Sequence, residues 1–197
     1  LPGGFAPLAQ VLRAMEDAGK IRRGYFVEGL TGAQFALPGA VDRLRDARDA
    51  SRDASDEDAP VLALAAVDPA NPYGLLLPWP TAVISDGETA SEATPPRRAA
   101  GTRIVLVSGR LVFFVDRGGR SLRVFTDDPA TIAAGVSGLR QVAQRRRPRG
   151  LRIETVDGTP ALRSPLLPAL RAGGFRAEPG AIVLDDVNRG SDQRSNI

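Results

Sequence analysis

The stretch Gly101–Thr126 reads GTRIVLVSGRLVFFVDRGGRSLRVFT, and it decides the fold of the chain. It contains three short apolar runs, Arg103–Val107, Leu111–Val115 and Leu122–Thr126, which are separated by turn residues. The first two runs are apolar on both faces, as in the central strands of a covered sheet. Glycines between the runs can adopt the positive φ of tight hairpins. The stretch therefore predicts an antiparallel meander, in the middle of a β-barrel or a strongly curled sheet.

A helix and a hairpin are predicted near the start of the chain. Apolar residues recur at helical spacing over Pro7–Ala18, and Gly19 ends this helix. The runs Ile21–Glu28 and Ala33–Leu37, joined by a short link, predict two strands. Helix, strand, turn and strand form the second half of a winged helix, namely the groove-entering helix and its wing. We therefore assign residues 1–40 to a truncated winged helix.

A linker follows this unit. Residues 41–59 begin with paired charges at helical spacing and then lose their apolar positions. This pattern predicts a charged linker that is helical at first and then disordered. At the other end of the chain, residues 186–197 are polar and predict a disordered tail.

The second domain is predicted over residues 60–185. It holds the meander, a helix beginning at Pro129, a further strand over Leu151–Val156 and a short helix beginning at Ser164. The predicted fold class is α+β, with a mostly antiparallel, β-barrel-like domain that contains two helices. Trp79 stands between two prolines, which predicts a rigid corner with the indole packed at the edge of the core. The alternative is an aromatic platform for a nucleobase.

Composition excludes several classes of function. The 197 residues include no cysteine and no histidine, which removes disulfides, thiolate nucleophiles, Ser-His-Asp triads and ordinary zinc sites. We therefore expect no metal site. No apolar run approaches the roughly 18 residues of a membrane span, and no signal peptide is visible. A cytoplasmic protein without membrane contact is expected.

Arginine supplies nearly all of the positive charge, because Lys20 is the only lysine among 26 basic residues. One explanation is that this composition is partly a codon-bias signature of a GC-rich genome. A functional explanation is that guanidinium groups suit phosphates and base edges. The candidate nucleic-acid contacts are Gln10, Arg13, Lys20, Arg22, Arg23, Arg145, Arg146, Arg147 and Arg149.

Both groups of basic residues also have a structural explanation. Winged helices serve as spacers between proteins, and Arg22 and Arg23 are then merely solvated. Cations near the end of a helix are favoured by its macrodipole, which accounts for Arg145–Arg149 without a ligand. However, four guanidinium groups within these five residues repel one another, and an anionic partner would relieve the repulsion. This favours phosphate contact by the second group.

Several blocks of sequence, taken in order, resemble a known family. They are Arg22–Arg45 (RRGYFVEGLTGAQFALPGAVDRLR), Asp68–Gly74 (DPANPYG), Leu77–Pro80 (LPWP), Arg97–Gly101 (RRAAG), Val115–Leu122 (VDRGGRSL) and Gly174-Phe175. Over nearly its whole length the chain resembles the C-terminal end of an Lhr-type, or large helicase-related, protein. The family is a superfamily 2 ATP-dependent translocase that unwinds DNA and RNA:DNA hybrids 3′ to 5′ in bacterial DNA repair. Its C-terminal region is similar to AlkZ-like glycosylases, with winged helices and a β-barrel-containing module.

The resemblance implies a nucleic-acid-binding and assembly module of such a helicase. DNA or an RNA:DNA hybrid is the implied partner, together with the preceding helicase and winged-helix domains. The chain itself lacks an ATPase motor, because Ile21 follows Gly19 and Lys20 where a phosphate-binding loop has serine or threonine. ATP and Mg²⁺ are therefore expected only in the motor domains of the parent protein, and no cofactor is expected in this chain.

Two alternatives come from other classes of function. The resemblance also implies a uracil DNA glycosylase, which needs a carboxylate beside a flipped base. Asp116 in the meander and Asp185 or Asp186 after the last strand are the candidates, although such positions more often hold ordinary turn or strand-end carboxylates. The other alternative is a structural oligomerisation barrel, in which the chain forms a homo-oligomer and its arginines bind no ligand.

Overall fold

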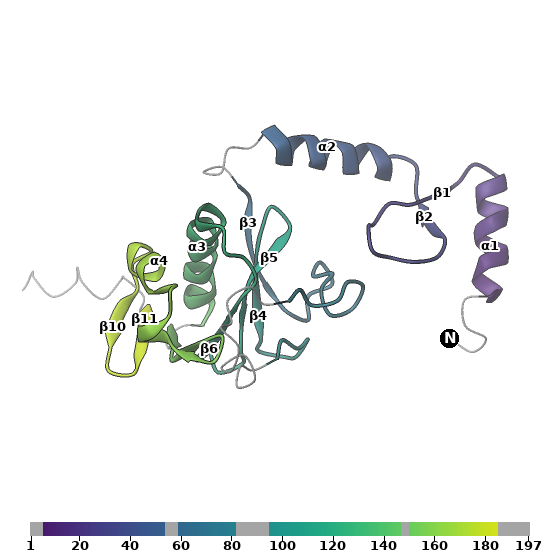
Figure 1. Cartoon of the computed structure of the whole chain (residues 1–197). Coiled ribbons are helices and arrows are strands. Elements are labelled where there is room, and N and C mark those ends of the chain that lie inside the picture. Colours follow the sequence, from purple (N-terminus) through teal and green to yellow (C-terminus); the bar gives the residue numbers. More distant parts are fainter. Residues whose placement is uncertain (1–5, 54–58, 82–94, 147–149, 185–197) are drawn as a thin grey trace, which may run out of the picture. The chain divides into compact units, whose positions relative to one another are not determined.

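The computed structural model describes residues 6–53, 59–81, 95–146 and 150–184. Within these residues it has four α-helices and mostly antiparallel strands, which confirms the predicted α+β class. The chain separates into two compact units, Leu1–Ala54 and Ser55–Ile197, and most of their elements are labelled in Figure 1. No helix in the described ranges is long and apolar enough to cross a membrane.

The first unit consists of α1 (Ala6–Asp17), β1 (Arg22–Gly24), β2 (Gln34–Ala36) and α2 (Ala40–Asp53). α1 ends where Gly19 adopts a φ of +68°, a conformation that glycine takes without strain. The two strands pair antiparallel, with Arg23 opposite Phe35. The predicted helix and wing are therefore both present.

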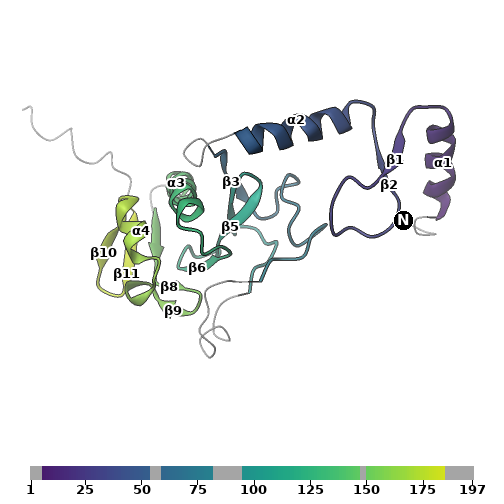
Figure 2. The ribbon, with the colours of Figure 1, turned by 45° about the horizontal axis from the view of Figure 1, so that its top comes forward.

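The second unit contains a six-stranded sheet. In spatial order its strands are β3 (Val61–Ala65), β4 (Arg103–Val107), β5 (Arg110–Val115), β6 (Ser121–Val124), β8 (Thr155–Val156) and β9 (Thr159–Pro160). The antiparallel order β4–β5–β6 confirms the predicted meander. β8 then joins β6 in parallel, and Figure 2 labels β6, β8 and β9. Across the described strands the sheet stays open between its edges β3 and β9, so it does not close into a barrel.

A three-stranded antiparallel sheet completes the unit, in the order β10 (Arg176–Glu178), β11 (Ala181–Leu184) and β7 (Leu151–Ile153). The single strand predicted over Leu151–Val156 is wrong, because its two halves belong to different sheets. The break lies at Glu154, whose amide donates a hydrogen bond to the carbonyl of Arg120 (2.7 Å). The chain crosses from one sheet to the other at this residue.

Two helices pack in the larger core of this unit, α3 (Pro129–Arg145) and the short α4 (Leu167–Ala172). Asp128 caps α3, because its carboxylate accepts hydrogen bonds from the amide and hydroxyl of Thr131, and these bonds lower the pKa of Asp128. Gly135 and Gly138 let the helix lie close to the sheet. A Cβ at Gly135 would lie 2.8 Å from the ring of Phe113, and one at Gly138 would clash with Val105.

The loop that follows β3 covers a smaller core of Ala66, Ile104, Leu106, Leu111, Phe114 and Phe125. Trp79 meets Phe114 edge-on, with ring centroids 5.7 Å apart, which confirms that the indole packs at the edge of the core. The guanidinium of Arg98 holds the loop by donating to the carbonyl groups of Asn71 (2.7 Å) and Asp68 (3.1 Å), among others. Both faces of the central strands are thus covered.

A buried ion pair joins β6 to the turn after β8. Nε of Arg123 lies 3.0 Å from Oδ1 of Asp157, whose side chain is 4% exposed. The same oxygen accepts a hydrogen bond from the amide of Val124 (3.2 Å). Burial raises the pKa of Asp157 to about 6, although the amide of Val124 and the charge of Arg123 act in the opposite direction.

The buried carboxylate predicts a pH dependence of stability. The pKa of Asp157 is about 6 in the folded chain, against a reference value of 3.8, so the folded chain binds the proton more tightly than the unfolded chain does. The stabilisation that comes from this proton is therefore complete below about pH 4 and is lost as the pH rises through 6. The loss amounts to roughly 3 kcal/mol. Asp157→Asn removes this titration, so the unfolding free energy of the wild type should fall relative to this variant between about pH 4 and pH 7.5.

Urea unfolding followed by Trp79 fluorescence measures this difference. The matched control is Asp127→Asn, which removes an exposed carboxylate and should leave the pH profile parallel to that of the wild type. Parallel profiles for Asp157→Asn would contradict the role given to Asp157.

Candidate functional site

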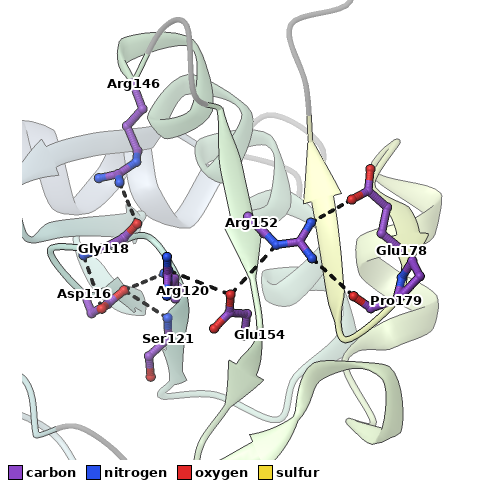
Figure 3. Close-up of polar contacts among 9 residues, drawn as sticks. All are labelled: Asp116, Gly118, Arg120, Ser121, Arg146, Arg152, Glu154, Glu178 and Pro179. Carbon is purple, nitrogen blue, oxygen red and sulfur yellow. Dashed lines mark hydrogen bonds and ion pairs between the residues drawn. The ribbon is translucent and has the colours of Figure 1, made fainter.

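One end of the second unit collects arginines from segments that are far apart in the sequence. The turn between β5 and β6 carries Arg117 and Arg120, α3 ends at its C-cap residue Arg146, and β7 carries Arg152. These four residues, with Gly118 and Gly150, line a groove of about 650 Å³, which we call the arginine groove. Its lining contains no carboxylate among the described residues. Figure 3 shows the polar contacts around it.

A carboxylate fixes the turn that carries Arg117 and Arg120. Oδ1 of Asp116 accepts hydrogen bonds from the amides of Arg120 (2.7 Å) and Ser121 (2.9 Å). Its Oδ2 accepts one from the amide of Gly118 (3.2 Å; Figure 3). Both oxygens of this predicted catalytic candidate therefore bind the backbone of its own turn, which is the behaviour of an ordinary hairpin carboxylate.

Arg146 fastens the end of α3 to the same turn. Its Nη2 donates to the carbonyl of Gly118 (2.7 Å) and its Nη1 to that of Arg117 (3.2 Å). The guanidinium lies against Gly119, where a Cβ would come within 2.9 Å of Cζ of Arg146. Gly119 also has a φ of +71°, so both the contact and the backbone conformation require glycine. Arg146 therefore shapes the groove.

A line of alternating charges joins the two sheets beside the groove. Oε1 of Glu154 lies 3.8 Å from Nε of Arg120 and 3.8 Å from Nε of Arg152. Arg152 also forms an ion pair with Glu178 (2.7 Å) and donates to the carbonyl of Pro179 (3.2 Å; Figure 3). Because Arg152 uses all of its guanidinium nitrogens in these contacts, it holds β7 to the β10–β11 hairpin.

Arg117 and Arg120 are the groove residues whose guanidinium groups remain available to a ligand. Among the described residues, no hydrogen bond or ion pair involves the side chain of Arg117, whose stem lies against Gly101. Arg120 makes only the long contact with Glu154 in that part of the chain, and 69% of its side chain is exposed. Neither residue was among the predicted contacts, although the signal was present: two arginines flank a glycine pair in the turn of the meander.

The arginines of the predicted cluster at the C-terminal end of α3 have different contacts in the structure. Arg146 lines the groove, whereas the neighbouring Arg145 turns away and donates from Nη1 to the carbonyl of Ala63 on the edge strand β3 (2.5 Å). Four further candidates lie outside the described residues, namely Arg147, Arg149, Asp185 and Asp186.

The remaining predicted contacts lie on the first unit, and all of them are exposed: Gln10, Arg13, Lys20, Arg22 and Arg23. Nε of Arg23 lies 3.5 Å from a carboxylate oxygen of Glu16. Gly19 and Lys20 follow the end of α1, whereas the lysine of a phosphate-binding loop opens a helix, so these residues do not fit a nucleotide. No metal-binding group of acidic residues was found in the described part of the chain.

Comparison with known proteins identifies relatives. Residues 1–56 match the family model of the large helicase-related protein winged-helix domain. Over 162 residues, or 82% of this chain, the sequence is 46% identical to a Mycolicibacterium smegmatis protein named Lhr helicase/probable uracil glycosylase. Over 181 residues, or 91% of this chain, it is 38% identical to an Escherichia coli protein named Lhr helicase/uracil glycosylase. The matched parts are 10% and 11% of these relatives, so the chain spans about a tenth of their length.

The contact between Gly119 and Arg146 predicts a measurable cost of substitution. Gly119→Ala should lower the free energy of unfolding by about 2 kcal/mol, because it strains the backbone and displaces the guanidinium. Gly109→Ala is the matched control, since Gly109 has a φ of +78° but no atom lies within 4 Å of the position that the new methyl group would take. It should cost about 1 kcal/mol, from backbone strain alone.

Urea denaturation of both variants, repeated with Arg146→Ala, gives the test. The excess cost of Gly119→Ala over Gly109→Ala should vanish once Arg146 is truncated. An excess that persists would mean that Arg146 does not rest on Gly119.

Proposed function

The chain belongs to the Lhr-type large helicase-related proteins as a C-terminal module, and we propose that it binds nucleic-acid phosphates for the helicase motor of its parent protein. The observation that carries this proposal is the arginine groove, which four arginines and two glycines line. Guanidinium groups bind phosphate oxygens through paired, charge-assisted hydrogen bonds. The groove therefore has the chemistry of a phosphate-backbone contact.

In this proposal, two of the groove arginines hold the walls of the groove in place and the other two contact phosphate. Arg146 and Arg152 are held by the carbonyl and carboxylate groups described above, so they fix the walls. Arg117 and Arg120 extend from a turn that Asp116 keeps rigid, and they make the phosphate contacts. Because the turn is already ordered, little conformational entropy of the backbone is lost on binding.

The partners proposed for this module are DNA or an RNA:DNA hybrid and the other domains of the same protein. ATP hydrolysis and strand separation belong to the motor domains of that protein, because Gly19 and Lys20 do not form a phosphate-binding loop. A bacterial helicase that acts on chromosomal DNA works in the cytoplasm, and we place the chain there.

Phosphate contact by Arg117 and Arg120 predicts a change in salt dependence. In the Arg117→Ala/Arg120→Ala variant, two contacts are lost, so the slope of log K against log salt should become shallower by about 2. Fluorescence anisotropy with a labelled DNA duplex between about 50 and 200 mM salt measures this slope.

Arg110→Ala/Arg171→Ala is the matched control, because it removes the same charge from two other exposed positions of the second unit. Its slope should equal that of the wild type. Equal slopes for both double variants would reject the groove as the contact. A wild-type chain that binds no DNA at low salt would favour a structural role in oligomerisation.

A second candidate function is removal of uracil from DNA, which the names of both relatives favour. A glycosylase needs a carboxylate that stabilises the sugar cation or activates water. Asp116 uses both oxygens within its own turn, so we propose Asp185 or Asp186 for this role.

Incubation with a uracil-containing oligonucleotide tests this candidate. The wild-type chain should produce an abasic site, and either Asp185→Ala or Asp186→Ala should abolish the product. Asp192→Ala is the control: it removes another carboxylate from the same end of the chain and should leave the activity unchanged. If the wild-type chain forms no abasic site under conditions where the full-length parent protein forms one, the activity is excluded from this module.

A further inference from the structure

The wing of the first unit exposes an aromatic side chain. Tyr25 directly follows β1 and is 91% exposed, more than any other large hydrophobic residue of the described ranges. No hydrogen bond or ring contact to Tyr25 is present among those residues. Both faces of its ring are therefore open to a ligand.

The loop beside Tyr25 is held by one glutamine. Oε1 of Gln34 accepts hydrogen bonds from the amides of Phe26 (2.9 Å) and Val27 (2.8 Å). Its Nε2 donates to the carbonyl groups of Val27 (3.0 Å) and Leu30 (3.1 Å). A side-chain amide has two donor hydrogens and two acceptor lone pairs, so Gln34 uses its whole capacity on this loop. The backbone that follows Tyr25 is consequently fixed.

The neighbouring aromatic residue has the opposite environment. The ring of Phe26 lies over Gly24, where a Cβ would come within 3.1 Å of Cζ of Phe26. Phe26 thus packs on the strand while Tyr25 stays in water, so exposure is not a general property of this segment. Tyr25 is 91% exposed and so adds little to the packing of the wing. An aromatic side chain on a fixed loop loses little conformational entropy when a ligand covers it.

Positive side chains precede Tyr25 along the chain. Lys20, Arg22 and Arg23 are all exposed. Arg22 and Arg23 are successive residues of β1, so their side chains lie on opposite faces of the strand, and Arg23, two residues before Tyr25, keeps 58% of its side chain exposed beside Glu16. An aromatic platform next to a positively charged track is the usual arrangement for binding single strands, because bases stack on the ring while phosphates contact the cations. A base within a duplex has both of its faces covered by its neighbours, so this arrangement selects an unpaired base.

We propose that Tyr25 stacks on an unpaired nucleobase of a single strand whose phosphates contact the exposed basic side chains of Lys20 and Arg23. This inference rests on the proposed nucleic-acid binding and adds the class of ligand, a single-stranded segment. It also gives the two units different tasks: the arginine groove contacts phosphates of any strand, and the wing detects bases that are unpaired.

Anisotropy measurements with the full chain test the inference on three labelled probes: a short single-stranded DNA, an RNA of the same sequence and the blunt DNA duplex. Tyr25→Ala should weaken binding of the single strand about tenfold. Binding of the duplex should stay within about twofold of the wild type. The salt slope should not change, because no charge is removed. The comparison of DNA with RNA identifies which strand supplies the base.

Two control variants separate stacking from other effects. Tyr25→Phe keeps the ring and should bind the single strand as the wild type does, since stacking needs no hydroxyl. Val27→Ala shortens another exposed apolar side chain of the same loop, 42% exposed, and should also bind normally. The melting temperature of Tyr25→Ala should match that of the wild type, because 91% of Tyr25 is exposed and little packing is lost with its ring.

The outcomes separate this inference from the proposed function. Normal binding of the single strand by Tyr25→Ala would overturn the inference, while a shallower salt slope of Arg117→Ala/Arg120→Ala would still support the groove. Equal losses for Tyr25→Phe and Tyr25→Ala would show that the hydroxyl makes the contact and would overturn stacking. A lowered melting temperature for Tyr25→Ala, or an equal loss on the duplex, would also overturn it. Absence of any binding by the wild type would reject both proposals.

Discussion

Burial of both faces of β4 and β5 is the constraint on which the second unit depends. Phe113 and Phe114 are adjacent in sequence and point to opposite cores, so the sheet must be covered on each side. α3 covers one side, at a distance that only Gly135 and Gly138 permit, and the loop with Trp79 covers the other. α3, which packs in the larger core, ends beside the β5–β6 turn. The packing of this core therefore also brings together the residues of the arginine groove.

Several like charges can gather in the groove because three of its four arginines, Arg120, Arg146 and Arg152, each contact a carboxylate or a backbone carbonyl group. The carbonyl groups of the turn accept hydrogen bonds from Arg146, and Glu154 and Glu178 balance Arg152. Arg146 also lies at the C-terminal end of α3, where the helix dipole favours a cation. Such neutralisation leaves the lining basic without the repulsion that unpaired guanidinium groups would cause.

Local patterns predicted the elements, and non-local pairing decided the site. The meander, the start of α3 and the helix with its wing follow from periodicity and turn residues, which are properties of short segments. The different contacts of Arg145 and Arg146 do not follow from composition, because Arg145 is the last residue of α3 and reaches Ala63, whereas Arg146 is the C-cap residue and reaches the β5–β6 turn. Arg120 and Arg152 both contact Glu154 because the chain passes from one sheet to the other at that residue. The prediction of a single strand did not include this crossing. A closed barrel was not reached, since β8 and β9 have only two residues each.

The contact between Arg145 and Ala63 has a consequence for solubility. β3 is an outer strand of the described sheet, and outer strands offer unpaired backbone groups to other chains. A guanidinium from α3 occupies one of these carbonyl groups, so an incoming strand must first displace a charged side chain. Arg145, which the sequence predicted to contact nucleic acid, thereby protects the edge strand β3 and disfavours intermolecular β-pairing and aggregation there.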